Sequence, residues 1–418
     1  SIVGDGMKRR KGVAGTFFSA LAFGGINIHA IAQGSSERSI STVVSLEDGD
    51  KAVRIAHRFF FNTMQTVEVF LFGIGVVGGK LLDQIRLQQE GLRKQRVDLR
   101  VWCVCNSRKM LVSKEGIGLD TWRERLESAK DASSVDAVLA FVRAEKPLNP
   151  VFVDCTASGA LPERYPDILA AGMHIVTPNK RANSLSMEFY CALRETAVAN
   201  RKRFLYETNV GAGLPVIDTF QSMMKSGDSL IDFSGILSGS LSYIFGRLDE
   251  GASFSQAVLE AREKGFTEPD PRDDLSGTDV ARKALIIARE AGYSLELADI
   301  AIDTVFPEGF DLGGTVQEFL ARLPSVDAWF AERIATLRAG GKALRFAASV
   351  RGETGETRVG ALEVPLAHPL AAIRGGENAF VFTTKYYSPI PLVIRGYGAG
   401  ADVTASGIFA DILRTAKW

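Results

Sequence analysis

Cysteine, histidine and net charge are all scarce in this chain of 418 residues. Its four cysteines, Cys103, Cys105, Cys155 and Cys191, show no CxxC spacing. Cys103 and Cys105 share a strand face and are most simply core residues, which suits a reducing cytosol. The four histidines are scattered, and no metal-ligand cluster is recognisable. No run of about 18 or more apolar residues occurs, so we expect no membrane span. A formal net charge of zero argues against nucleic acid or an anionic membrane as the main partner.

A glycine fingerprint is the first positive signal. It consists of Gly73, Ile74, Gly75, Val76, Val77 and Gly78. An apolar strand precedes it and a helical pattern through Leu81, Leu82 and Ile85 follows, which is the context that a dinucleotide-binding motif requires. In such a motif the first glycine makes the tight turn, the second lets the backbone approach a pyrophosphate, and the third lets helix and strand touch. The sequence therefore predicts a Rossmann-like nucleotide-binding domain.

The next strand, over residues 99–105, ends without the acid that usually binds the ribose hydroxyls of NAD. Ser107 and Arg108 stand there instead, and a guanidinium suits the 2′-phosphate of NADP. NADP is therefore favoured and NAD stays possible, although Arg108 fits a solvated loop equally well. Thr156 and Ser158 follow the buried strand 151–154 and are candidates to touch the cofactor; as plain turn formers they would need no ligand.

Lys180 follows a short strand that begins at His174 and ends in a proline turn. At the carboxyl edge of the same sheet, its ammonium would reach the nicotinamide or the substrate. An ordinary surface lysine is the competing interpretation.

The segment from Glu268 to Lys283 concentrates acids beside two prolines and one helix start. We expect a helix over residues 279–291, capped by Ser276 or Thr278. Asp279 and Lys283 are four residues apart, so they project from one side of that helix, about 5–6 Å apart at Cβ. A carboxylate and an ammonium held there could bind a zwitterion and pass a proton. An exposed ion pair is the alternative.

A glycine-rich loop from Glu207 to Pro215 can turn several carbonyls inward. A hard monovalent cation takes oxygen ligands of that kind. The loop could equally cross between domains, with glycines that only relieve backbone strain.

The sequences TPNK, ETNVGAGLP, GILSGSLSYIFG, GFTEPDPRDDLSGTDVARK and GYGAGADVTASGIFADILRT together resemble the homoserine dehydrogenases. The resemblance extends from Thr66 to Trp418 and is strongest to the dehydrogenase portion of bifunctional aspartokinase/homoserine dehydrogenases. It implies NAD(P)-dependent interconversion of L-homoserine and L-aspartate 4-semialdehyde, in threonine and methionine biosynthesis. Because the EPDPRDDLSG…DVARK element is highly specific, we carry the roles of the family's residues over to the matching residues of this chain.

The resemblance implies four groups of site residues. Lys283 would be the acid/base, acting with Asp279 and Lys180. Glu268, Asp279 and Asp274 would bind the substrate, while Gly265 and Gly400 would lie against the cofactor. A sodium ion would be held by Glu207 and by Val210, Ala212 and Leu214.

The first 65 residues have a different pattern. A basic start at Met7–Lys11 and the apolar stretch behind it could pass for a signal peptide, but glycines and an asparagine interrupt the stretch. We expect instead a helix over 13–23, strands over 26–32 and 39–45, and a helix over 50–60, which with residues 1–3 make a βαββα unit. With GINIHAIAQGSSERSIS, this unit resembles an ACT regulatory domain.

An ACT domain implies an amino-acid effector, here threonine, with Asn27 and Gln33 as candidate contacts. No kinase half precedes the unit, so we expect the chain to be the C-terminal part of a longer polypeptide. Its ACT unit would either pair with another subunit or be poorly buried.

The predicted fold class is α/β, a Rossmann-like domain with an inserted α/β catalytic and dimerisation domain after the ACT-like unit. The expected bounds are 1–64 for the ACT-like unit, 65–203 for the nucleotide domain, 204–385 for the catalytic domain and 386–418 for the return to the nucleotide domain. We expect a cytoplasmic homodimer or tetramer.

Two other functions compete. An aspartate-semialdehyde dehydrogenase would need a cysteine nucleophile, for which Cys155 is the candidate, but no histidine partner is evident. A non-catalytic amino-acid sensor would be built on the ACT unit, but intact Glu268, Asp279 and Lys283 argue against it.

Overall fold

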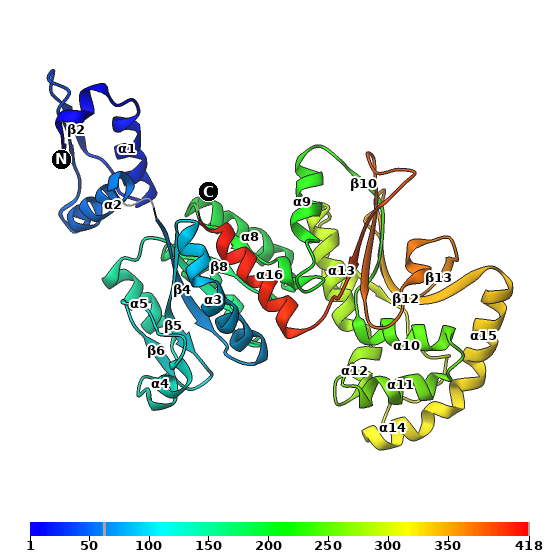
Figure 1. Ribbon diagram of the computed structural model, residues 1–418. Helices are drawn as coiled ribbons and strands as arrows, with labels where there is room; N and C mark the ends of the chain where they lie inside the picture. Colours follow the sequence, from blue (N-terminus) through cyan, green and yellow to red (C-terminus); the bar gives the residue numbers. More distant parts are fainter. Residues whose placement is uncertain (62–63, 417–418) are drawn as a thin grey trace. The chain divides into compact units, whose positions relative to one another are not determined.

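The computed structural model describes residues 1–61 and 64–416 (Figure 1). The predicted end of the last domain at Trp418 lies outside these residues. Among them, no helix combines the length and apolarity that crossing a membrane requires. The contacts divide the chain into two compact units, one made of Ser1–Phe70, Ile85–Phe152 and Leu413–Trp418, the other of Leu71–Gln84 and Val153–Ile412.

The N-terminal residues form the predicted βαββα arrangement. Its elements are β1 (Ile2–Val3), η1 (Asp5–Arg9), α1 (Val13–Phe23), β2 (Ala30–Gln33), β3 (Ser39–Val43), η2 (Leu46–Asp48) and α2 (Gly49–Phe61). The sheet order is β1-β3-β2, with both pairs antiparallel. The helix over 13–23 is as predicted, whereas the strand predicted over 26–32 begins only at Ala30.

This small sheet is unevenly covered. Helices α1 and α2 pack on each other over a core that includes Phe17, Leu21, Ile40 and Ile55. By contrast, all four residues of β2 are exposed, and Ile31 keeps 57% of its surface accessible. The N-terminal unit is therefore well packed on one side and open at the β2 edge.

The nucleotide-binding part contains a six-stranded sheet of order β6-β5-β4-β7-β8-β9. Its strands are β4 (Gln65–Phe72), β5 (Val97–Cys105), β6 (Met110–Val112), β7 (Pro150–Asp154), β8 (His174–Val176) and β9 (Phe204–Leu205). Its helices are α3 (Val76–Lys94), α4 (Trp122–Ser128), α5 (Val135–Glu145), η3 (Leu161–Arg164), α6 (Tyr165–Ala170), α7 (Arg181–Ser184) and α8 (Met187–Ala199). His174, expected as a packed strand-end residue, is buried and accepts the Arg203 N–H at Nδ1.

A second six-stranded sheet has the order β11-β13-β12-β10-β14-β15. Its strands are β10 (Leu230–Ile236), β11 (Ala301–Ile302), β12 (Lys342–Arg351), β13 (Thr357–Pro365), β14 (Asn378–Thr384) and β15 (Leu392–Gly396). The helices are η4 (Glu207–Asn209), α9 (Ile217–Lys225), α10 (Gly239–Asp249), α11 (Phe254–Glu263), α12 (Pro271–Leu275), α13 (Thr278–Glu290), η5 (Leu297–Asp299), α14 (Val316–Arg322), η6 (Leu323–Val326), α15 (Asp327–Ala339), η7 (Pro369–Ala372) and α16 (Ala401–Arg414).

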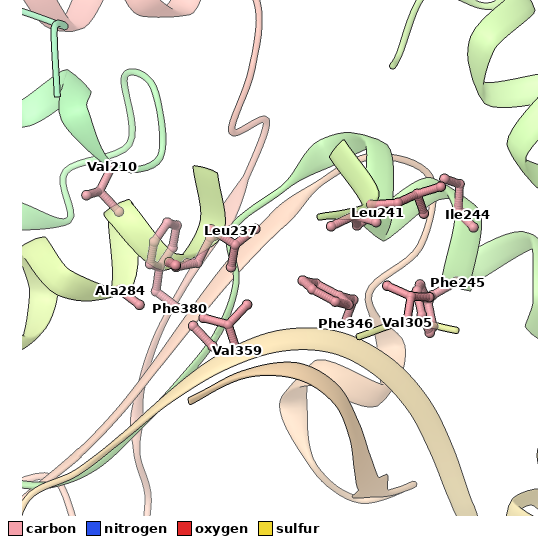
Figure 2. Packing of buried hydrophobic residues seen from close by; sticks show 14 of the residues in the cluster. Val210, Leu237, Leu241, Ile244, Phe245, Ala284, Val305, Phe346, Val359 and Phe380 are labelled. Carbon is pink, nitrogen blue, oxygen red and sulfur yellow. The ribbon is translucent and has the colours of Figure 1, made fainter. Parts of the chain in front are cut away.

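The large core lies between this sheet and its helices, since α10, α13 and α15 all contact β12. Figure 2 shows Leu241, Ile244 and Phe245 of α10 gathered near Phe346 of β12, with Ala284 of α13 close to Phe380 of β14. Fully burying one such aromatic or aliphatic side chain contributes about 1.5–3 kcal/mol. This packing is what fixes α13, and with it the candidate site residues.

The cap predicted for α13 is wrong. Its N-cap is Gly277 at φ 70°, not Ser276 or Thr278. Ser276 ends the preceding short helix α12, which the sequence analysis did not predict, although its Oγ still accepts the N–H of Thr278 at 3.2 Å. A Cβ at position 277 would lie 2.9 Å from Cζ of Phe346, so only glycine fits both the backbone angle and the space.

Candidate active site

The glycine fingerprint lies between β4 and α3, as predicted. Gly73 has φ 89°, and a Cβ there would come within 2.6 Å of the Cys155 carbonyl carbon. A Cβ on Gly78 would lie 1.9 Å from the Gly73 oxygen, so the helix approaches the turn as closely as the motif requires. At Gly75 a Cβ would meet nothing within 4 Å, and the exposed Val76 opens α3. The free N–H groups of this first turn can receive phosphate oxygens.

Ser107 and Arg108 lie in the turn that follows β5, and both are exposed. The Oδ1 of Asn106 accepts the backbone N–H groups of Arg108 and Lys109, which fixes the turn. Arg108 is therefore exposed on a turn whose backbone is held by hydrogen bonds. Binding a 2′-phosphate would require an accessible guanidinium of this kind.

The turn after β7 is held by Asp154, a fully buried carboxylate that the sequence analysis did not single out. Its oxygens accept bonds from the Thr156 N–H at 2.8 Å, the Tyr165 hydroxyl at 2.6 Å and the Asn179 side chain at 3.2 Å. Burial raises the pKa of Asp154, although these donors oppose the increase. Asp154 thus ties the turn that carries Thr156 to the turn that carries Lys180.

Ser158 takes part in the same arrangement. Its N–H donates to Oγ1 of Thr156, and its carbonyl accepts the side-chain N–H of Asn179 at 2.9 Å. Thr156 and Ser158 therefore form hydrogen bonds within the turn, as plain turn formers would. A contact of either residue with a cofactor remains a prediction. An aspartate at a strand end, followed by threonine and serine, is the signal that could have indicated this latch.

Lys180, Asp279 and Lys283 are brought together. The carboxylate of Asp279 lies 2.8 Å from Nζ of Lys283 and 3.4 Å from Nζ of Lys180. Lys283 also donates to the carbonyl of Leu237, at 2.7 Å, at the end of β10. Its side chain is 12% exposed, so its ammonium does not point into bulk water.

The electrostatics of the three groups are coupled. Burial alone would raise the pKa of Asp279, but the charges of Lys283 and Lys180 hold that pKa well below its ordinary value. For Lys180, burial lowers the pKa; Asp279 raises it in turn, and Lys283 lowers it again. One carboxylate thus stands between two ammonium groups, and Lys180 releases its proton more readily than a free lysine.

Glu268 and Asp274 are also neighbours, but they do different things. Asp274 accepts the backbone N–H of Glu268 at Oδ2, 2.8 Å, and the hydroxyl of Ser240 at Oδ1, 2.7 Å. Glu268 is exposed. Asp274 therefore fixes the segment that carries Glu268 onto the start of α10, while the Glu268 carboxylate faces solvent. Ser240 lies in the GILSGSLSYIFG motif, but the sequence analysis did not identify it as a hydrogen-bond partner of Asp274.

Gly265 and Gly400 both have positive φ, 69° and 124°. Gly265 follows α11, where its N–H donates to the Arg262 carbonyl, so it serves the helix end. Gly400 stands immediately before α16. Neither position is blocked, and cofactor contacts there remain predictions.

The Glu207 loop has an internal role. The carboxylate of Glu207 is buried and accepts the N–H groups of Ile217, 2.7 Å, and Asp218, 2.8 Å, at the start of α9. Burial raises its pKa to about 7, which these two donors oppose. The carbonyl of Leu214 accepts the Val216 N–H. Two of the four predicted sodium ligands are thus already hydrogen-bonded within the protein. These bonds hold the loop in its conformation without a cation.

The two effector candidates lie in the N-terminal unit. Asn27 and Gln33 are both exposed, Asn27 before β2 and Gln33 at its end. Within the described residues no group of three His, Cys, Asp or Glu side chains could hold a metal.

The glycine turn, the strand-end polar turns and the lysine–carboxylate group place this chain in the class of NAD(P)-dependent oxidoreductases. Models of protein families match in the same order along the chain, an ACT domain over residues 1–60, the NAD-binding domain of homoserine dehydrogenase over 73–207 and homoserine dehydrogenase over 215–413.

A homoserine dehydrogenase from Schizosaccharomyces pombe is 37% identical over 83% of this chain and 95% of its own length. A bifunctional aspartokinase/homoserine dehydrogenase from Haemophilus influenzae is 52% identical over 99% of this chain and 51% of its own length. A hyperthermophilic archaeal homoserine dehydrogenase, solved in complex with NADPH, has a TM-score of 0.64 at 23% identity, covering 84% of this chain and 97% of its own, which shows the shared fold.

This chain belongs to the homoserine dehydrogenase family. It spans about half the length of the bifunctional relatives it matches.

Proposed function

We propose that the chain interconverts L-homoserine and L-aspartate 4-semialdehyde with NADP, and with NAD as a weaker alternative. The observation that carries the proposal is the group formed by Lys180, Asp279 and Lys283, in a member of this family. Arg108 supports the preference for NADP because a guanidinium binds a 2′-phosphate bidentately.

When bound, the nucleotide would supply the hydride acceptor for C4 of homoserine. Lys283, held by Asp279 and the Leu237 carbonyl, would take the hydroxyl proton as a neutral amine, directly or through water, and in the reverse direction its ammonium would return that proton to the aldehyde oxygen. The depressed pKa of Lys180 makes it a second place for that proton. Glu268 is exposed and free to pair with the substrate ammonium, while Asp274 fixes the segment that presents it.

Initial rates decide the matter. NADPH oxidation with aspartate semialdehyde, and NADP or NAD reduction with homoserine, should both be measurable, with a lower KM for NADP. No turnover with either substrate would refute the proposal.

The cysteine alternative receives no support. Cys155 is partly accessible, but burial raises the pKa of its thiol, so it is not poised as a thiolate. Exposed Cys191 would react first with a thiol reagent. We therefore expect a Cys191→Ser variant to stay active after thiol blocking, whereas inactivation of that variant would favour the cysteine mechanism.

Sodium, threonine and a second subunit complete the proposal. Glu207, with the carbonyls of Val210, Ala212 and Leu214, would hold a sodium ion, and replacing sodium by a bulky organic cation should lower the rate. Threonine would bind near Asn27 and Gln33. Exposed Ile390 and Val393, just before and on the edge strand β15, support a homodimer or tetramer, and the four free thiols support a cytoplasmic location.

A further inference from the structure

Another charged residue of α13, Arg289, is fully buried, with 0% of its side chain exposed. All five of its N–H groups have acceptors. Nη1 donates to the carbonyls of Asn183, 3.0 Å, and Leu185, 2.8 Å. Nε and Nη2 donate to the carbonyl of Leu295, 3.0 and 2.7 Å, and Nη2 also reaches Glu296, 3.2 Å. A guanidinium with every donor satisfied is a rigid joint between the segments that it touches.

One of these segments leads directly to a candidate catalytic group. Asn183 and Leu185 lie at the end of α7, and Lys180 is the N-cap of that same short helix. Helices α7 and α13 are therefore joined twice, by Lys180 and Asp279 at one end and by Arg289 at the other. The Asp279 side chain is half exposed, and an ion pair of that kind is too weak to hold two helices alone.

Further bonds support the same joint. Glu296, which accepts from Arg289 at Oε2, accepts the N–H of Met187 at Oε1, 2.7 Å, at the start of α8. Buried Asn183 donates to buried Asn209 at 2.9 Å, and Asn209 donates to the Thr177 carbonyl at 2.8 Å, at the beginning of the Lys180 turn. The turn is thus held before and after the lysine.

We infer that Arg289 is a positioning residue that sets the spacing between Lys180 and the Asp279–Lys283 pair. This inference rests on the proposed function only for the two lysines' part in catalysis. A lysine at position 289 would keep the charge but could not reach the carbonyls of α7 and of Leu295 together, because it lacks the planar fork. Lys180 would then move away from Asp279, and small displacements of reacting groups are costly.

The chain offers a matched control in Arg345, which is equally buried. Its guanidinium binds the carbonyls of Leu344, Leu370 and Ala371 and the carboxylate of Asp249, all far along the chain from α7. Arg345→Lys therefore removes the same kind of buried fork without touching the lysine turn.

The experiment compares Arg289→Lys with Arg345→Lys in the full chain. For Arg289→Lys we expect kcat to fall about tenfold or more, an NADPH Kd within about twofold of the parent, and a shifted pH profile of kcat/KM. The charged groups that act on Lys180 are Asp279, Lys283 and Arg282, and only Asp279 raises its pKa. Arg345→Lys should lose similar thermal stability and keep the parental pH profile.

A second readout does not need turnover. The labelling rate of Lys180 by an amine reagent, followed by mass spectrometry against pH, should increase in Arg289→Lys, because losing Asp279 lowers the pKa of Lys180 further. Unchanged labelling and an unchanged pH profile in Arg289→Lys, or equal changes in both variants, would overturn the inference. A parent chain that is inactive with homoserine, but in which Arg289→Lys still alters Lys180 labelling, would overturn only the proposed function.

Discussion

The N-terminal unit and the catalytic part of this chain differ in how fully their sheets are covered by other packed elements. In the catalytic part, the sheet from β10 to β15 is packed against α10, α13 and α15, and α13 carries Asp279 and Lys283, with Asp279 also paired with Lys180 at the N-cap of α7. In the N-terminal unit the core is small and β2 is exposed along its whole length. The catalytic part therefore holds its candidate site residues on a well-packed helix, whereas the N-terminal unit presents a strand edge of the kind that can pair with another strand.

We expect the largest effect from Lys283→Ala, which tests whether the catalytic part supplies the acid/base group. Losing a positioned proton acceptor should lower kcat by about 10²–10⁴-fold. Cofactor affinity should survive, because Lys283 bonds to Asp279 and Leu237 rather than to the glycine turn. Nucleotide titration by fluorescence gives the affinity, and Lys342→Ala on the exposed start of β12 is the control. Near-parental turnover in Lys283→Ala would remove the acid/base assignment.

The next effect concerns stability. Gly73→Ala would place a Cβ 2.6 Å from the Cys155 carbonyl carbon at a φ of 89°, so we expect a loss of about 3 kcal/mol or more. Gly75→Ala is the matched change, since its Cβ would meet nothing within 4 Å. It should fold normally and weaken only nucleotide binding. Chemical denaturation and nucleotide titration separate the two, and equal stability losses would contradict the assigned roles.

A smaller, pH-dependent effect is expected at Glu207. Its folded pKa, about 7, is above its ordinary value of 4.5, so the folded state binds more protons between these values. The free energy of unfolding should therefore decrease as pH rises from about 4.5 to about 7, by up to about 3 kcal/mol, and then level off. Glu207→Gln should abolish this slope. Denaturation curves across the range test it, and an unchanged slope in the variant would assign the titration to another group.

The smallest effect on basal turnover is expected in the N-terminal unit. Asn27→Ala and Gln33→Ala should each change kcat without threonine by less than about twofold, because both side chains are exposed and neither is a candidate catalytic group. If threonine inhibits the chain, both variants should require more of it. A large loss of basal activity in either variant would contradict this expectation. It would mean that the N-terminal unit influences turnover even without threonine.

Patterns local in the chain were predictable from sequence. The Gly73–Gly78 turn, the helix over residues 13–23 and the apolar face of α13 follow from spacing and residue type, and the structure confirms them. The pairing of Asp279 with Lys283 follows from helix geometry as well.

Contacts between distant segments were not predictable in the same way. The aspartate, threonine and serine at 154–158 could have indicated the turn itself, but not that Asn179 and Tyr165 bind Asp154, because those bonds depend on the strand order. The cap of α13 was misassigned since serine and threonine are good caps in general, whereas here Phe346 and the backbone angle decide. The sodium ligands were placed by resemblance, and their competing bonds to α9 become visible only in three dimensions.

Gly277 has a consequence for how the site can change. The helix that carries both Asp279 and Lys283 starts from the one kind of residue that has no side chain, because the ring of Phe346 occupies the place where a side chain would go. Any larger residue there would tilt the helix and displace the acid and the amine as a pair. A smaller side chain at position 346 would relieve the contact with the ring but not the φ of 70°, so it should restore an alanine at 277 only in part. The start of the helix that carries the acid and the amine is thus constrained by a residue about 70 positions further along the chain.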